Sequence, residues 1–99
     1  MPLKYARYEL EFDIPADVED ETIEDLIAAD SKWDSANGTC YRIGKYPDTV
    51  DVELTNCKEM RINILKVRGF LIDPRMDDLV SKLREAGLIP YMESYGNLD

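Results

Sequence analysis

Strict alternation of apolar and charged side chains near the start of the chain most limits how this sequence can fold. The apolar side chains on one face of residues 3–14 are Ala6, Tyr8, Leu10, Phe12 and Ile14. The charged side chains on the other face are Arg7, Glu9, Glu11 and Asp13. A period of two over this length predicts a β-strand with one buried face and one open face. Pro15 ends the strand because proline cannot donate a ladder hydrogen bond.

Helical spacing follows this strand. Asp17 or Asp20 can cap a helix that runs to about Asp30, because a short carboxylate accepts hydrogen bonds from the free N–H groups of a first turn. The apolar residues on one face of this segment are Ile23, Leu26 and Ile27. This spacing predicts an amphipathic helix.

A second helix is indicated at both of its ends. Asp73 is expected as its N-cap, Pro74 occupies the first helical position, and Gly87 marks its end. Its apolar stripe consists of Met76, Leu79, Val80 and Leu83. A last strand over residues 88–95 follows, and Pro90 favours an edge position for it.

Three short strands are expected between the helices, over about 39–46, 49–56 and 60–68. Turn-forming residues separate them, with Pro47-Asp48 between the first two. The resulting order, βαβββαβ, predicts a single α+β domain over residues 1–99, with a mostly antiparallel sheet and two helices on one face. We expect a ferredoxin-like arrangement with one added strand.

The two cysteines are expected to lie near each other in the first of these hairpins. A turn around residues 47–49 would place Cys40 opposite residue 56 or 57, next to or opposite Cys57. Such a pair could bridge under oxidation, and two buried free thiols are the favoured interpretation. Two thiolates in a chain without histidine are an incomplete zinc site.

Negative charge is concentrated in one part of the chain. The sequence carries 21 acidic and 12 basic residues, for a net charge of −9, and 11 of the acids fall between Glu9 and Asp34. This excess of acid repels nucleic-acid backbones and anionic membranes. The first helix opens with several acids, which its dipole stabilises. We therefore expect the acids to divide between the open face of the first strand and the first helix.

The exposed face of the first helix is the predicted interaction site. Carboxylates there can accept hydrogen bonds from Lys and Arg on a basic protein surface. The residues expected to make these contacts are Glu19, Glu21, Glu24 and Asp25. The sequence thus favours a non-enzymatic protein that binds a macromolecular partner. The alternative is a small dimeric ferredoxin-like module that binds a metabolite or a divalent cation on its open sheet face or at the dimer junction.

Few groups suited to catalysis are present. The chain has no histidine to activate a serine or a cysteine, and no glycine motif for phosphate or dinucleotide binding. A calcium loop is not predicted, because residues 17–25 lack a glycine and a helix directs its carboxylates apart. We predict no catalytic residue, no metal ligand and no cofactor.

Apolar and aromatic residues on the open sheet face suggest a homodimer interface. In the expected phase of the strand over 60–68, Leu65 and Val67 share the open face with Arg61. The residues expected at this interface are Tyr5, Leu65, Val67 and Tyr91.

Arg68-Gly69-Phe70 resembles the first residues of a strand motif in RNA-recognition domains. Residues 71–74 replace the aromatic continuation of that motif, so Phe70 is expected to pack in the core after a bend at Gly69. No direct nucleic-acid binding is predicted for so acidic a chain.

The first ten residues, MPLKYARYEL, lack the apolar run of a signal peptide, and no apolar stretch approaches the length of a membrane span. The cytoplasm is therefore the expected location.

Overall fold

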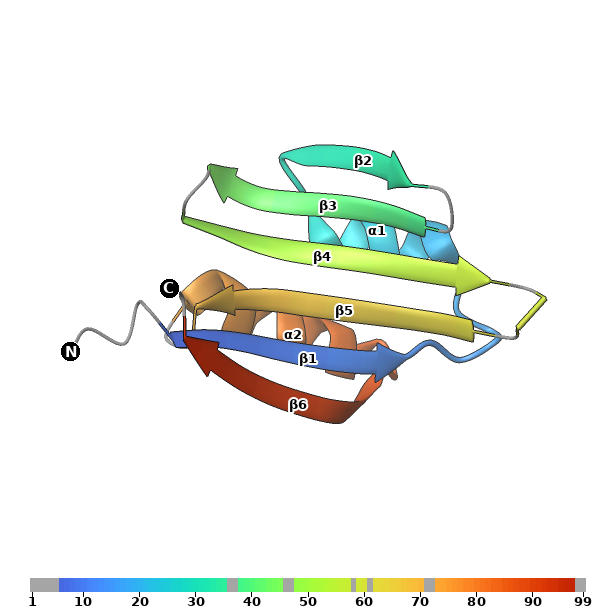
Figure 1. The fold of residues 1–99 in the computed structure, drawn as a ribbon. Helices are drawn as coiled ribbons and strands as arrows, with labels where there is room; N and C mark the ends of the chain where they lie inside the picture. Colours follow the sequence, from blue (N-terminus) through green and yellow to red (C-terminus); the bar gives the residue numbers. More distant parts are fainter. Residues whose placement is uncertain are drawn as a thin grey trace.

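The computed structural model describes residues 6–35, 38–45, 48–57, 59–60, 62–70 and 73–97, and its architecture is α+β. The elements in chain order are β1 (Ala6–Asp13), α1 (Asp20–Ile27), β2 (Ser31–Ser35), β3 (Gly38–Lys45), β4 (Asp48–Cys57), β5 (Ile62–Phe70), α2 (Pro74–Glu85) and β6 (Ile89–Asn97). Six strands form one antiparallel sheet in the order β2-β3-β4-β5-β1-β6 (Figure 1). The first strand of the chain therefore lies inside the sheet, between β5 and β6.

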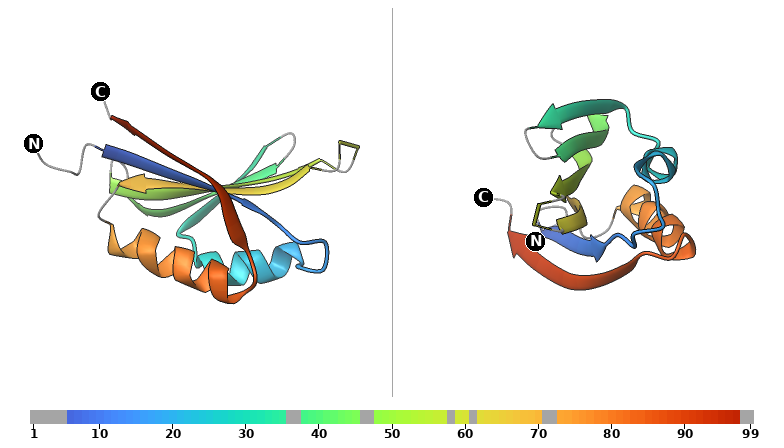
Figure 2. Two further views of the ribbon diagram at one scale, coloured as in Figure 1. Left: turned by 90° about the horizontal axis from the view of Figure 1, so that it is seen from below. Right: turned by 90° about the vertical axis from the view of Figure 1, so that its right-hand side faces the viewer.

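Both helices lie on the same side of the sheet (Figure 2). The side chains that fill the space between the helices and the sheet include Leu10, Phe12, Ile23, Ile27, Val52, Met76, Leu79 and Leu83. Leu10 and Phe12 come from the predicted apolar face of β1, which confirms the period-two assignment. Within the described residues, no helix is long and apolar enough to cross a membrane.

One strand was missed by the sequence analysis. Ser31–Ser35 forms β2, a five-residue edge strand that pairs with β3, so the observed order is βαββββαβ. Its sequence, SKWDS, has no apolar alternation and contains only one large apolar side chain, Trp33. Such a strand is stabilised by backbone hydrogen bonds to its neighbour. These bonds require no particular side chains, so the sequence of the strand does not reveal it.

The first helix is shorter than predicted. It ends at Ile27, because Ala28 adopts a left-handed conformation with φ of 50°. Its N-cap is Glu19, whose side chain makes no capping hydrogen bond, so the expectation that Asp17 or Asp20 caps the helix was wrong. Its first turn does carry Asp20 and Glu21, where the helix dipole favours negative charge.

The pairing of β3 with β4 differs from the expected register. Lys45 pairs with Asp48, which places Cys40 opposite Glu53 and not opposite residue 56 or 57. Cys57 lies at the end of β4, beyond the last residue that pairs with β3. The proposed cross-strand cysteine pair is therefore wrong. The reason is that the tighter connection between the strands shifts the partner of every β3 residue.

The phase of β5 is also the opposite of the expected one. Leu65 and Val67 are fully buried in the core, where they pair with Leu54 and Val52 of β4. Lys66, between them in the sequence, lies on the open face instead. Because side chains alternate along a strand, an error of one residue in phase exchanges the two faces completely. Leu65 and Val67 are thus core residues and contribute nothing to an exposed dimer interface.

Arg75 links the start of α2 to the sheet through hydrogen bonds to Asp73 and Asp48. The Asp73 side chain, which is 7 % exposed, accepts a hydrogen bond from the backbone N–H of Arg75 at 2.9 Å. It also accepts from Arg75 Nη2 at 2.7 Å, and the same nitrogen donates to the carboxylate of Asp48 at 3.1 Å. The predicted Asp73 cap is confirmed, and Arg75 extends it into a contact with the start of β4.

Replacing Asp73 with alanine is expected to lower the free energy of unfolding by about 2 kcal/mol at neutral pH, because it removes an N-cap and the closest partner of Arg75. The hydrogen bonds from Arg75 lower the pKa of the Asp73 carboxyl. A lowered pKa in the folded state gives stability that is complete above about pH 4, the usual range of the unfolded carboxyl, and lost as pH falls through the folded value.

Chemical denaturation of the wild type and Asp73→Ala at neutral and acidic pH measures this effect. The difference in stability should shrink as the pH falls. Asp73→Asn, which retains a capping oxygen, should lose less than the alanine variant at neutral pH. Equal losses in the two variants would show that the cap is not what stabilises this end of α2.

Candidate functional site

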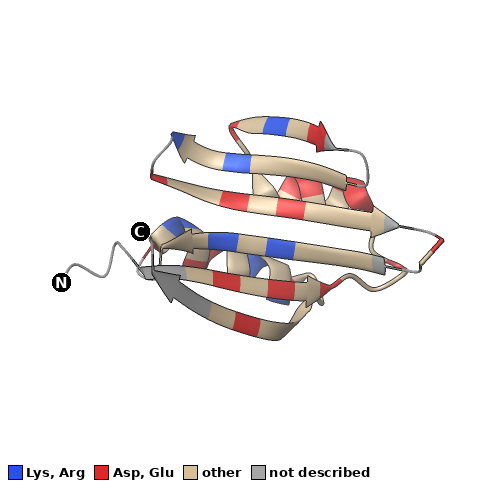
Figure 3. Cartoon of the chain, in the orientation of Figure 1, with Lys and Arg blue, Asp and Glu red and all other residues tan. Residues whose placement is uncertain are grey.

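Helix α1 and the loop before it form the most acidic part of the molecule. Six acidic residues and no basic one fall between residues 16 and 27. Figure 3 shows these acids gathered on α1, behind β3 and β4. The exposed acids of the helix and its cap are Glu19, Asp20, Glu21 and Asp25, while Glu24 is half-buried.

Glu24 has a structural role. Its carboxylate accepts hydrogen bonds from the Tyr41 hydroxyl at 2.7 Å and from Lys32 Nζ at 3.0 Å. The bond from Tyr41, with that from Lys32, lowers the pKa of Glu24, and Glu24 in turn raises the pKa of Lys32. Burial, reinforced by the Glu24 carboxylate, raises the pKa of Tyr41 well above its usual range. Glu24 therefore joins α1 to β2 and β3.

The other three predicted contact residues remain exposed and unpaired within the described part of the chain. Glu19, Glu21 and Asp25 take part in no ion pair there, and Glu21 and Asp25 lie four residues apart on one helix face. Like charges at this spacing repel. Asp25 also lies in the last turn, where the helix dipole disfavours a carboxylate and where no basic residue offsets it. Apart from the favourable position of Glu21 in the first turn, no contact of these carboxylates within the described residues stabilises the fold.

Several acids of the strands lie next to bases on the neighbouring strands. One row across the open face pairs Arg42 with Asp51 at 2.9 Å and Arg68 with Glu9 at 3.0 Å. In the next row, Lys66 Nζ lies 3.5 Å from Glu11 and 4.0 Å from Glu53. Figure 3 shows the result as alternating bands, with bases on β3 and β5 and acids on β4 and β1.

The expected division of the acids therefore has a clear electrostatic meaning. Glu9, Glu11, Asp51 and Glu53 on the open sheet face lie beside bases of neighbouring strands. The exposed acids of α1 and its cap have no such base within the described residues. Part of the surplus negative charge is therefore exposed on this helix.

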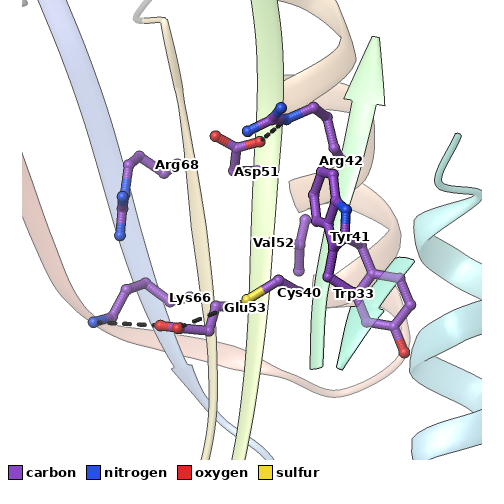
Figure 4. A pocket seen from close by; sticks show the side chains of 9 residues that line it. All are labelled: Trp33, Cys40, Tyr41, Arg42, Asp51, Val52, Glu53, Lys66 and Arg68. Atoms are coloured by element: carbon purple, nitrogen blue, oxygen red, sulfur yellow. Dashed lines mark hydrogen bonds and ion pairs between the residues drawn. The ribbon is translucent and has the colours of Figure 1, made fainter. Parts of the chain in front are cut away.

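A groove lies on the open face, over β2 to β5 (Figure 4). Its volume is about 370 Å³. Its exposed or half-exposed lining consists of Trp33, Cys40, Arg42, Asp51, Glu53, Lys66 and Arg68. The Arg42 guanidinium stacks over the Trp33 ring, 4.7 Å from its centroid. The sequence analysis missed this groove, because residues from four strands meet there through a register that it did not obtain.

Cys40 in this groove is a free thiol of low reactivity. Burial, together with the nearby Glu53 carboxylate, raises the pKa of the thiol. The thiolate, which is the reactive form, is therefore disfavoured at neutral pH. The Cys57 side chain lies outside the described residues.

The predicted dimer-interface residues are not brought together. Tyr91, on β6, is 50 % exposed, and its hydroxyl donates a hydrogen bond to Glu11 at 3.4 Å. Leu65 and Val67 lie in the core, and Tyr5 lies outside the described residues. Two exposed apolar residues of β6 that the sequence analysis did not single out, Ile89 and Met92, lie near Tyr91 instead.

Neither a metal site among the described residues nor a relative with a known role identifies the function of the groove or of α1. No group of three or more His, Cys, Asp or Glu side chains in the described residues is placed to hold a metal ion. Comparison of the chain with protein-family models, with curated proteins and with solved structures gave no match. The described residues define a small α+β protein with an acidic helix and a groove of mixed charge.

Two adjacent carboxylates on α1 offer a matched test of the role of Glu24. Glu24→Ala is expected to lower the melting temperature, because it removes the acceptor shared by Tyr41 and Lys32. Asp25→Ala should leave the melting temperature unchanged or raise it, because it removes a repulsive charge near the helix C-terminus. Differential scanning calorimetry of both variants measures the contrast. Equal destabilisation would refute the assignment of distinct roles.

Proposed function

We propose that this protein binds a basic surface of a macromolecular partner through the exposed acids of α1. The contacts are Glu19, Glu21 and Asp25, with Asp20 beside them. One observation carries the proposal: these acids have no base partner within the described chain, whereas Glu9, Glu11, Asp51 and Glu53 on the open sheet face each lie within 4.0 Å of a base. Glu24, one of the four contacts expected from the sequence, is assigned to holding the helix in place.

The arrangement of the acids favours a protein partner over a metal ion. Carboxylates on successive turns point in different directions, whereas a divalent cation needs several oxygens converging on one point. A basic protein surface presents separate Lys and Arg side chains, each able to meet one carboxylate. Because these charges are exposed, their attraction acts mainly on the rate of association and is screened within about 8 Å at physiological salt.

The fold itself supports a narrower description. We infer that β4, β5, β1 and β6, with α1 and α2, form a ferredoxin-like unit. The support is their order in the sheet, with the first and third of these strands in the chain, β1 and β5, at the centre and antiparallel to each other. β2 and β3 then extend this unit at one edge by two strands. This likeness concerns the fold and by itself implies no activity.

Charge reversal on α1 tests the proposed partner surface. Immobilised wild-type protein is expected to retain a basic protein from an extract of the source cell, and the double variant Glu21→Lys, Asp25→Lys should bind that protein at least about tenfold more weakly. A matched control is Asp77→Lys, Glu85→Lys, which makes the same change in net charge on α2. The control should bind like the wild type.

The measurement is the dissociation constant of the retained protein, determined for each variant at two salt concentrations. Binding by the wild type should weaken with salt. An equal loss in the α1 variant and the α2 control would indicate an effect of net charge alone, and the proposal would then be dropped.

A second candidate is self-association through β6, and a specific observation favours it. This nine-residue strand ends the sheet, and Ile89, Tyr91 and Met92 on it are 73 %, 50 % and 51 % exposed. Long apolar edge strands readily pair with another strand, whereas short charged ones such as β2 resist pairing. An antiparallel pair of β6 strands is related by a two-fold axis, so two copies of the chain satisfy each other.

Sedimentation velocity tests this candidate. The wild type is expected to sediment as a dimer, and the variant Ile89→Lys, Met92→Lys as a monomer, because charges on an edge strand oppose pairing. Asp77→Lys, an exposed position in the first turn of α2, serves as the control and should remain dimeric. A wild-type protein that is monomeric at every concentration reached would exclude the candidate.

A further inference from the structure

The groove on the open face presents three kinds of chemical group in a fixed order. Trp33 lies on β2 at one side, Glu53 on β4 near the middle, and Arg68 with Lys66 on β5 at the other side (Figure 4). Apart from the Arg42–Asp51 ion pair, which lines the same groove, an aromatic ring, a carboxylate and a pair of cations thus follow one another across the strands. A ligand complementary to this order carries a ring, then a cation, then an anion.

The carboxylate in the middle is loosely paired. Glu53 is 43 % exposed at its side chain, and its nearest base, Lys66, is 4.0 Å away. Lys66 lies closer to Glu11, at 3.5 Å. The other neighbour of Glu53 is the Cys40 thiol at 3.9 Å, which is a weak donor. Glu53 therefore retains acceptor capacity for an ammonium group.

Arg68 retains donors in the same way. It donates to Glu9 through Nε at 3.0 Å, and its side chain is 44 % exposed. A guanidinium has five N–H donors, and only one of them is used in that bond. The two terminal nitrogens form a fork that suits a carboxylate.

Trp33 provides the ring, and its neighbours hold it. Arg42 stacks on Trp33 and is itself paired with Asp51 at 2.9 Å, which fixes the stacked pair against β3 and β4. Trp33 is nevertheless 44 % exposed, so part of the indole remains available at the border of the groove. Exposed aromatic surface of this kind binds a second ring by offset or edge contacts.

The size of the groove limits the ligand to a small molecule. Strands lie about 4.8 Å apart, so β2 and β5 are separated by roughly 14 Å at the backbone, and side chains reaching inward shorten the gap. A volume of about 370 Å³ lies at the lower end of the range for small-molecule sites. The lining carries three bases and two acids, whereas the whole chain carries −9, so the groove does not share the general acidity of the surface.

We propose that this groove binds an aromatic α-amino acid. The ligand ring packs on Trp33, its ammonium group donates to Glu53, and its carboxylate accepts from Arg68. Glu53 and Arg68 lie on the neighbouring strands β4 and β5, so the two charged groups of the ligand must be close together. An α-amino acid meets this requirement because its ammonium and carboxylate groups are attached to the same carbon. This site shares no residue with the acidic face of α1 and does not depend on the binding of a basic partner there.

The sole tryptophan of the chain gives a direct measurement. Titration of L-phenylalanine, which does not absorb where tryptophan can be excited, should change the Trp33 fluorescence saturably with a dissociation constant below about 1 mM. Three analogues separate the contacts: 3-phenylpropionate lacks the ammonium group, phenethylamine lacks the carboxylate, and L-alanine lacks the ring. Each is expected to bind at least about tenfold more weakly.

Variants assign the contacts to residues. Glu53→Gln replaces the carboxylate with an amide of nearly the same size. It should weaken the binding of L-phenylalanine by about tenfold and leave the binding of 3-phenylpropionate unchanged. Glu21→Lys with Asp25→Lys should bind L-phenylalanine like the wild type, because α1 lies on the other face of the sheet. Heteronuclear NMR of the single indole N–H gives a second readout that does not depend on fluorescence.

Two results would overturn the proposal. One is the absence of a saturable change in both fluorescence and the indole signal up to about 1 mM L-phenylalanine. The other is equal binding of L-phenylalanine to the wild type and to Glu53→Gln, because the ammonium contact would then not exist.

Discussion

The antiparallel pairing of β1 with strands on both of its sides is the constraint on which the rest of the structure depends. β1 pairs with β5 and β6, two strands from the second half of the chain, and so brings the two halves into one sheet. Its alternating side chains then define two environments. Leu10 and Phe12 enter the core beneath the helices, while Glu9 and Glu11 meet bases of β5 on the open face. One strand thus decides where the core and the charged face lie.

The sequence predicted those features that depend on local chemistry. The two faces of β1 and the Asp73 cap of α2 follow from side-chain period and capping chemistry, which act over a few residues. Register does not. The pairing of Cys40 with Glu53 depends on a connection between strands, and the burial of Leu65 and Val67 depends on phase within β5. Strand β2 could not be predicted, because its sequence has no apolar alternation. The groove could not be predicted either, because its lining residues meet only once β3, β4 and β5 are correctly paired.

Electrostatic balance separates the two candidate sites. Bases of β3 and β5 lie beside acids of β4 and β1 on the open face, so the proposed ligand of the groove would be recognised through the order of its groups. On α1, by contrast, the exposed acids lack nearby bases within the described residues, and the proposed binding of a basic partner would depend on the total charge and on the ionic strength. Glu24 shows that position alone does not assign a role: it belongs to the same acidic helix as Asp25, yet two hydrogen bonds make it part of the fold.

Strand β2 contacts both candidate sites. On one face of the sheet, Lys32 is bonded to Glu24 of α1. Lys32 faces α1, and the next residue, Trp33, borders the groove on the opposite side of the sheet. A rigid-body shift of this short strand therefore moves the helix anchor and the aromatic wall together. A ligand that packs on Trp33 would therefore contact the same strand whose Lys32 is bonded to α1. The shortest strand of the sheet thus contributes one side chain to the anchor of α1 and the next to the wall of the groove.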